Sequence, residues 1–319
     1  MPRSSHPRLP RNVIALGLVS FFTDVSSEMI YPLLPMFLTG VLGASASFIG
    51  AIEGAAETTS AVLKLASGWW SDRVQRRKPL VVFGYALASL MRPLVAIAQS
   101  ATQVLVIRVS DRVGKGIRNA PRDALIADSV AASIRGRAFG FQRAADHAGG
   151  VVGPLIAFGL LRWWQLALRN VFWLAAIPGA VAVLVTIVGV AEVRTSDEGR
   201  GTSGSGTPHP SSLVPRPAPG LPSRFWAVLG VILVFTLGNS TDAFLLLRAT
   251  QLGVPTALAP VLWASLHVVK SVSSTPGGAF SDRAGRKPTL LAGWLLYAVV
   301  YVGFALASRP WQAWALFAV

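Results

Sequence analysis

Five ionisable residues stand out because they lie inside long apolar stretches of the chain. Asp24 and Glu28 are four residues apart, as are Glu53 and Glu57, so each pair would share one face of a helix. Arg108 lies in an apolar stretch of its own. A charge that faces lipid near the bilayer centre costs about 2.5 to 3.5 kcal/mol to insert. We therefore expect these groups to face a shared aqueous lumen, where carboxylates can carry protons or contact a solute.

Further polar residues extend this set along the same helices and into later ones. Tyr31 follows Glu28 on the same helical stripe, and Arg112 follows Arg108 by about one turn. The candidates for proton coupling or substrate contact are Asp24, Glu28, Tyr31, Glu53, Glu57, Arg108, Arg112, Asp146, Asp242 and His267. The alternative for each is a structural role, as a salt bridge or hydrogen bond that holds helices in register.

The composition requires lipid as the solvent for most of this chain. Hydrophobic residues make up 52% of it and charged residues only 13%, whereas soluble domains carry about a quarter charged residues. The net charge of +15 comes from basic clusters between apolar runs, which is typical of membrane topology signals rather than of nucleic-acid binding. We expect an all-α, polytopic transmembrane bundle that binds no nucleic acid.

Apolar segments long enough to cross about 30 Å of hydrocarbon recur nine times. They span residues 13–37, 46–70, 79–98, 101–118, 138–161, 170–190, 225–247, 255–279 and 288–307. A tenth segment begins at Pro310 and reaches only Val319, so we expect the chain to end inside a helix, truncated after its ninth span.

Basic residues and one linker predict the topology and the division of the chain. Lysine and arginine gather in alternate loops, which predicts that those loops and the N-terminus lie in the cytoplasm. We expect a multi-pass protein of the inner (plasma) membrane. A Gly-, Ser- and Pro-rich stretch at 192–222 reads as a flexible cytoplasmic linker. It separates a six-helix bundle at 1–191 from a partial second bundle at 223–319.

A duplicated loop sequence supports this division. GWWSDRVQRRKP runs from Gly68 to Pro79, and GAFSDRAGRKP runs from Gly278 to Pro288. Both copies resemble the GxxxDRxGRR/K loop motif of the major facilitator superfamily, which implies duplicated six-helix halves and a conformational latch. The alternative is a purely topogenic basic loop. The motif positions are Gly68, Asp72, Arg73, Arg76, Arg77, Gly278, Asp282, Arg283, Arg286 and Lys287.

The fifth apolar segment carries a second match. Gly149, Gly153 and Pro154 form GxxxGP, which resembles the kinked, glycine-rich motif of the antiporter branch of the superfamily. Glycines four apart let two helices approach closely, and ordinary transmembrane packing uses the same residues. The resemblance implies export by antiport.

Other function classes lack their parts in this sequence. There is no cysteine, no HExxH and no GxSxG, and GKG at 114–116 lacks the spacing of a phosphate-binding loop. We expect no enzyme activity, no cofactor and no metal. The predicted function is alternating-access transport of a small solute by a monomer in the bilayer, as proton-coupled efflux. Proton-coupled uptake, a uniporter or a channel are the alternatives.

Overall fold

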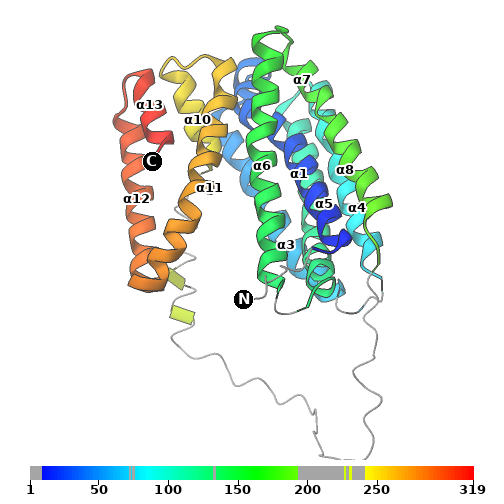
Figure 1. Cartoon of the computed structure of the whole chain (residues 1–319). Coiled ribbons are helices and arrows are strands. Elements are labelled where there is room, and N and C mark those ends of the chain that lie inside the picture. Colours follow the sequence, from blue (N-terminus) through cyan, green and yellow to red (C-terminus); the bar gives the residue numbers. More distant parts are fainter. Residues whose placement is uncertain are drawn as a thin grey trace, which may run out of the picture. The chain divides into compact units, whose positions relative to one another are not determined.

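The computed structural model describes residues 9–71, 73, 76–131, 134–192, 226–227, 230–231 and 241–319, without the side chains of 274–284 and 286. Every regular element in these ranges is helical (Figure 1), which confirms the predicted all-α bundle. The chain divides into one unit made of Met1–Arg194 and Asp242–Val319 and another of Thr195–Thr241. The helices below all belong to the first unit.

The first six predicted segments are present as helices. They are α1 Arg11–Ile30, extended by η1 Tyr31–Leu33, α2 Leu34–Met36 and η2 Phe37–Val41; α3 Ala46–Ser71; α4 Lys78–Met91, extended by η3 Arg92–Ile97; α5 Ala101–Asp128; α6 Arg135–Arg162; and α7 Leu168–Leu174 with α8 Ala176–Gly189. Their bounds agree with the sequence to within a few residues, except that α5 continues well beyond the predicted end at residue 118.

The later segments are described from residue 241 onward. They are α10 Asp242–Gln251, η5 Thr256–Leu258, α11 Ala259–Ala284, α12 Arg286–Leu306 and α13 Pro310–Phe317. The seventh predicted segment, 225–247, lies mostly outside the described residues, and only its last part falls in α10. The eighth and ninth segments correspond to α11 and α12.

Five of the described helical stretches are long and apolar enough to cross a membrane: Arg11–Val41, Lys78–Ile97, Arg135–Arg162, Leu168–Gly189 and Lys287–Leu306. The helices α3, α5 and α11 have 26, 28 and 26 residues, which at 1.5 Å per residue is about 40 Å. They are long enough to span but carry more polar and charged residues. These three helices supply most of the charges described below.

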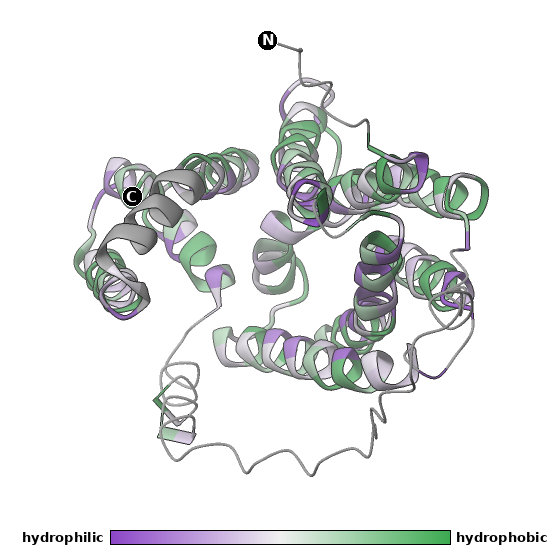
Figure 2. Cartoon of the chain, turned by 60° about the horizontal axis from the view of Figure 1, so that its bottom comes forward, coloured by the Kyte–Doolittle hydropathy of each residue, from purple (hydrophilic) through white to green (hydrophobic). Residues whose placement is uncertain are grey.

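The outer surface of the helices is strongly apolar. Figure 2 shows hydrophobic residues predominating along most helices, with hydrophilic residues grouped on parts of them. Leu65 and Leu306 each expose 78% of their surface, and Val188 exposes 77%. Such exposure is unfavourable in water and suits contact with lipid tails.

Local sequence explains several helix ends. Ser100 begins α5, where its hydroxyl accepts a hydrogen bond from the Gln103 amide at 3.3 Å. The first amides of α4 are satisfied by Glu192, whose carboxylate accepts from the backbone N–H groups of Arg77 and Lys78 at 2.8 and 2.9 Å. Each of these caps uses a residue type that can accept from an otherwise unpaired helix N–H.

The helix α1 packs mainly against α6 and α8. Its neighbour α6 approaches closely because it presents glycines. A Cβ atom at Gly149 would lie 2.5 Å from the Phe21 carbonyl oxygen, and one at Gly153 would lie 2.6 Å from that of Val25. The GxxxG spacing therefore sets the distance between α6 and the charged stretch of α1.

Candidate functional site

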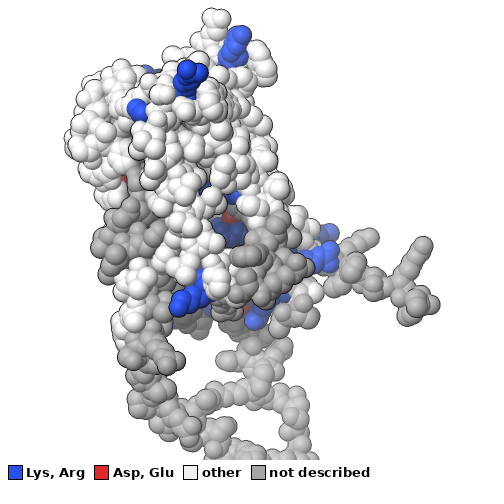
Figure 3. All heavy atoms as spheres, turned by 90° about the vertical axis from the view of Figure 1, so that its left-hand side faces the viewer, with Lys and Arg blue, Asp and Glu red and all other residues white. Residues whose placement is uncertain are grey.

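A polar cavity of about 270 Å³ lies where helices from both ends of the described chain meet. The space-filling view in Figure 3 shows basic and acidic atoms together in a recess of otherwise uncharged surface. The cavity is lined by Asp24, Ser27 and Glu28 of α1, Tyr31 of η1, Arg92 of η3, Arg112, Lys115 and Arg118 of α5, Asp242 of α10, and Trp263, His267 and Lys270 of α11. Six of the ten residues predicted from the sequence are among them.

Glu28 connects two groups of helices: the first six helical segments, α1 to α8, and the helices from α10 onward. Its Oε2 accepts a hydrogen bond from the indole Nε1 of Trp263 at 2.6 Å, and His267 Nε2 lies 3.9 Å from the same oxygen. The rings of Tyr31 and Trp263 are tilted against each other with centroids 4.9 Å apart. The spacing of Trp263 and His267, one turn apart on α11, brings both to Glu28. Glu28 is thus held by partners that approach from α11.

Asp24 differs from the other acids that line the cavity. Among the described residues, no cation lies within 4.0 Å of its carboxylate. The helix α6 packs closely against this part of α1, since a Cβ atom at Gly149 would lie 2.9 Å from the Asp24 Cβ. Asp24 therefore lines the cavity as a carboxylate without a direct protein counter-ion.

Four buried charges next to the cavity neutralise one another. Arg108 Nη2 donates to both carboxylate oxygens of Glu53, at 2.8 and 3.0 Å, and Arg108 Nη1 lies 3.9 Å from Asp111. Arg92 Nε donates to Asp111 at 3.0 Å, and its Nη1 donates to the Thr23 carbonyl at 2.8 Å. None of the four charged side chains exposes more than 9%. Two acids and two bases make this network electrically neutral, which favours a structural role.

The wall formed by α5 is basic. Arg112, Lys115 and Arg118 follow one another at spacings of three residues along α5 and line the cavity. Arg112 Nη2 lies 3.3 Å from Glu57, whose side chain is 62% exposed. The α5 helix continues to Asp128, so these residues lie well inside it and not near its end. The cavity therefore accommodates the three basic side chains of this part of α5.

The remaining predicted candidates lie at the edge of the site or behind it. Asp242 Oδ2 lies 3.4 Å from Lys270 Nζ, so the α10 acid pairs with an α11 base. Asp146 of α6 accepts a hydrogen bond at 2.7 Å from Gln142, which also donates to Ser20 at 3.0 Å. Neither Asp146 nor the Glu53–Arg108 pair lines the cavity.

Sequence reasoning left out several residues that line the cavity. They are Ser27, Arg92, Lys115, Arg118, Trp263 and Lys270. The three-residue spacing on α5 was a usable signal, since Lys115 and Arg118 continue the stripe that begins at Arg112. Arg92 lies inside the apolar segment 79–98, so the signal that marked Arg108 was present there too. No comparable signal marked Trp263, which is a common residue type in membrane helices.

The duplicated loop motif is only partly described. Asp72 and the side chains of Gly278, Asp282, Arg283 and Arg286 lie outside the described residues, while Lys287 is exposed. In the first copy, Gly68 packs near Ala120, Arg73 stacks over the Trp69 ring at 3.6 Å, Arg76 is exposed, and Arg77 pairs with Asp128. The described contacts of Arg77 join the loop to the end of α5 and, through its backbone N–H and Glu192, to the chain after α8.

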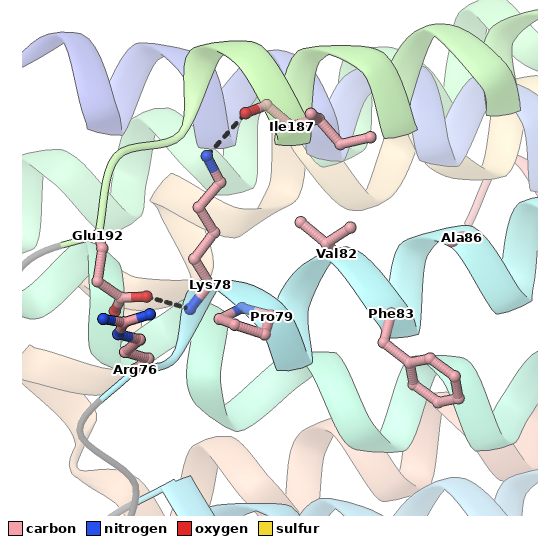
Figure 4. A pocket seen from close by; sticks show the side chains of 8 residues that line it. All are labelled: Arg76, Lys78, Pro79, Val82, Phe83, Ala86, Ile187 and Glu192. Carbon is pink, nitrogen blue, oxygen red and sulfur yellow. Dashed lines mark hydrogen bonds between the residues drawn. The ribbon is translucent and has the colours of Figure 1, made fainter.

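A larger hollow of about 750 Å³ lies between α4 and α8 (Figure 4), but it has a different character. Its wall includes Val82, Phe83 and Ile187, and Phe83 is 55% exposed. The Lys78 Nζ at its end donates to the Ile187 carbonyl at 2.7 Å. An exposed apolar hollow on an apolar helix surface suits lipid contact, so the charged cavity is the better candidate site.

Comparison with known proteins assigns the family. The sequence model of the Major Facilitator Superfamily matches residues 16–319. An uncharacterised MFS-type transporter of Methanocaldococcus jannaschii is 33% identical over 303 residues, which cover 93% of this chain and 73% of that protein. The multidrug resistance protein MdtH of Photorhabdus laumondii is 29% identical over 159 residues, 48% of this chain and 39% of that protein.

The fold comparison agrees with the sequence comparison. The crystal structure of a bacterial homologue of the human lysosomal transporter Spinster matches with a TM-score of 0.71 at 20% identity, covering 98% of this chain and 72% of that one. The predicted membership of the superfamily is therefore confirmed. The chain belongs to the Major Facilitator Superfamily of membrane transporters.

Proposed function

We propose that this protein is a proton-coupled secondary transporter that moves a small solute through the charged cavity, exporting it against inward proton flow. The observation that carries the proposal is Asp24, a carboxylate that lines a cavity between two groups of helices and has no cation within 4.0 Å among the described residues. An unpaired charge within a membrane-spanning helix is costly, and a proton is the simplest partner that removes it. Asp24 is the proposed proton site, with Glu28 beside it.

Contacts between the two groups of helices favour alternating access. Near its start α11 is buried, with Leu262 0% and Trp263 5% exposed. About one and a half turns later Val268 is 45% exposed, and about one further turn along Val272 is 70% exposed. We infer that α11 packs against the first six helical segments at the level of Glu28 and Trp263 and packs less closely toward its C-terminal end. In the proposed cycle this contact breaks while the other end of α11 closes, so that the cavity opens to the opposite side.

The proposed direction is export, with the N-terminus on the cytoplasmic side. It rests on the GxxxGP sequence of α6, which packs directly behind Asp24 and Glu28, and on the similarity to a protein named for multidrug resistance. Uptake by proton symport is a second candidate, which the basic wall of α5 favours. An anion and a proton carried together leave the net charge of the cavity unchanged.

Proteoliposomes containing the purified chain test this proposal. An inward-acid pH gradient is imposed, and lumenal pH is followed while a panel of cationic, neutral and anionic solutes is added. We expect at least one solute to trigger proton movement, and Asp24→Asn to reduce the rate at least 10-fold. Asp123→Asn is the matched control, because Asp123 pairs with Arg122 outside the cavity and its loss should leave the rate unchanged.

The direction of the proton relative to the solute separates the two candidates. Opposite movement of solute and proton supports antiport, and movement in the same direction supports symport. Solute transport that is equally fast in Asp24→Asn would refute Asp24 as the proton site. Solute transport without any proton movement in the wild type would refute proton coupling.

A further inference from the structure

The cations on the cavity wall are not all paired with a carboxylate. Its lining includes five cations, Arg92, Arg112, Lys115, Arg118 and Lys270, and three carboxylates, Asp24, Glu28 and Asp242. Three of the cations have a carboxylate partner within 4.0 Å: Arg92 pairs with Asp111, Arg112 with Glu57, and Lys270 with Asp242. Among the described residues, the remaining two cations, Lys115 and Arg118, have no carboxylate within 4.0 Å.

Arg118 is buried without a counter-ion. The residue is only 4% exposed, and the guanidinium nitrogens Nε and Nη1 have no hydrogen-bond partner among the described residues. Its contact on one side is the ring of Tyr85, 4.2 Å from the guanidinium carbon, whose hydroxyl is also without a partner. A buried guanidinium usually has its donors satisfied, because an unpaired charge in a low-dielectric interior costs several kcal/mol.

Lys115 lies three residues earlier on the same face of α5. No carboxylate of the described residues lies within 4.0 Å of its Nζ, and it lines the same cavity as Arg118. A helical spacing of three residues brings two side chains to one face, about 5 to 6 Å apart at Cβ. An ammonium and a guanidinium at this spacing can contact the same carboxylate or phosphate group.

We propose that Lys115 and Arg118 form an anion-binding subsite and that the transported solute is a small organic anion. The inference rests on the proposed use of this cavity for transport. The volume of about 270 Å³ is slightly below the range of about 300 to 1,000 Å³ found for small-molecule pockets, so the solute is compact. The Trp263 ring, which also lines the cavity, offers an apolar surface for the body of such a molecule.

Equilibrium binding to the purified chain tests the inference without requiring transport. Benzoate and phenyl phosphate are the anionic probes, and benzamide is the uncharged counterpart of benzoate. Titration calorimetry in a low-salt detergent buffer should show saturable binding of at least one anion and at least 10-fold weaker binding of benzamide. Arg118→Gln and Lys115→Gln should each weaken anion binding at least 10-fold.

Arg122→Gln is the control on the same helix, because Arg122 pairs with Asp123 at 2.8 Å and does not line the cavity. It should leave anion binding unchanged. Thermal unfolding distinguishes a binding role from a structural one, since removing an unpaired buried charge should keep or raise the unfolding temperature of Arg118→Gln. A lowered temperature together with unchanged anion affinity would overturn the inference.

Two further results would also overturn it: binding of neither anion to the wild type, or equal affinity for benzoate and benzamide. These outcomes are separable from failure of the proposed function. Proton movement triggered only by cationic or neutral solutes would refute the anion subsite and leave proton coupling intact. Anion binding that depends on Arg118, without proton movement, would do the reverse.

Discussion

Glu53 and Arg108 form a pair whose energy can be worked from the structure. The two contacts of 2.8 and 3.0 Å correspond to a gross attraction of about 6 kcal/mol at an effective dielectric constant of 20. Both side chains expose less than 10% of their surface, so removing one charge leaves the other buried. Breaking such a pair costs about 3 to 5 kcal/mol. Asp111 stays 3.9 Å from Arg108 but also pairs with Arg92, so we expect Glu53→Gln to cost about 3 kcal/mol.

A double-mutant cycle measures this interaction. Reversible unfolding in mixed micelles, followed by circular dichroism, gives the free energy of unfolding for Glu53→Gln, Arg108→Gln and the double variant. The double variant restores neutrality, so it should recover part of the loss and give a coupling energy of at least about 2 kcal/mol. Glu57→Gln is the comparison, because its pair with Arg112 is 62% exposed on the acid side and should cost below about 1 kcal/mol.

Additive losses in the cycle, with a coupling energy below about 0.5 kcal/mol, would contradict this reasoning. So would a Glu57→Gln variant that loses as much stability as Glu53→Gln. Either result would mean that burial does not decide which ion pairs hold the helices, and that Glu53 and Arg108 act independently.

Three further predictions follow from single contacts. Gly149→Val should lower the free energy of unfolding by about 1 to 3 kcal/mol or prevent folding, because the new Cβ would lie 2.5 Å from the Phe21 carbonyl oxygen. Thermal unfolding measures this loss, and Gly54→Val is the control because nothing lies within 4 Å of a Cβ there. Trp263→Phe removes the donor to Glu28 and should lower the solute transport rate at least 10-fold without lowering expression. Glu192→Gln should cost about 1 kcal/mol of unfolding free energy, since its carboxylate caps α4; an unchanged value would show that water satisfies those amides.

The extent of the helices was largely predictable from the sequence. A run of about 20 apolar residues can satisfy its backbone in lipid only as a helix, so run length alone predicts α1 or α12. The same reasoning ended α5 at residue 118, after a stretch in which charged residues become frequent, although the helix continues to Asp128. Hydropathy cannot distinguish a charge that leaves the membrane from one that enters a protein-lined cavity.

The candidate site was predictable only in part. Spacing on one helix showed that Asp24 and Glu28 share a face, and both line the cavity. Which partner lies opposite depends on the rotation and approach of other helices, and a single sequence does not contain that information. The hydrogen bond from Trp263 to Glu28, which joins residues 235 positions apart, could not be predicted for this reason.

Transport by the proposed cycle requires the cavity to open alternately to the two sides of the membrane. The chain contains no cysteine, so Ser27→Cys places a single thiol on the cavity wall, and Ser20→Cys, at a position 2% exposed and outside the cavity, is the buried control. A membrane-impermeant maleimide added to either side of oriented proteoliposomes reports access. We predict labelling of Ser27→Cys from both sides, with bound solute shifting the ratio, and little labelling of Ser20→Cys. Labelling of Ser27→Cys from one side only, under every condition, would contradict alternating access through this cavity.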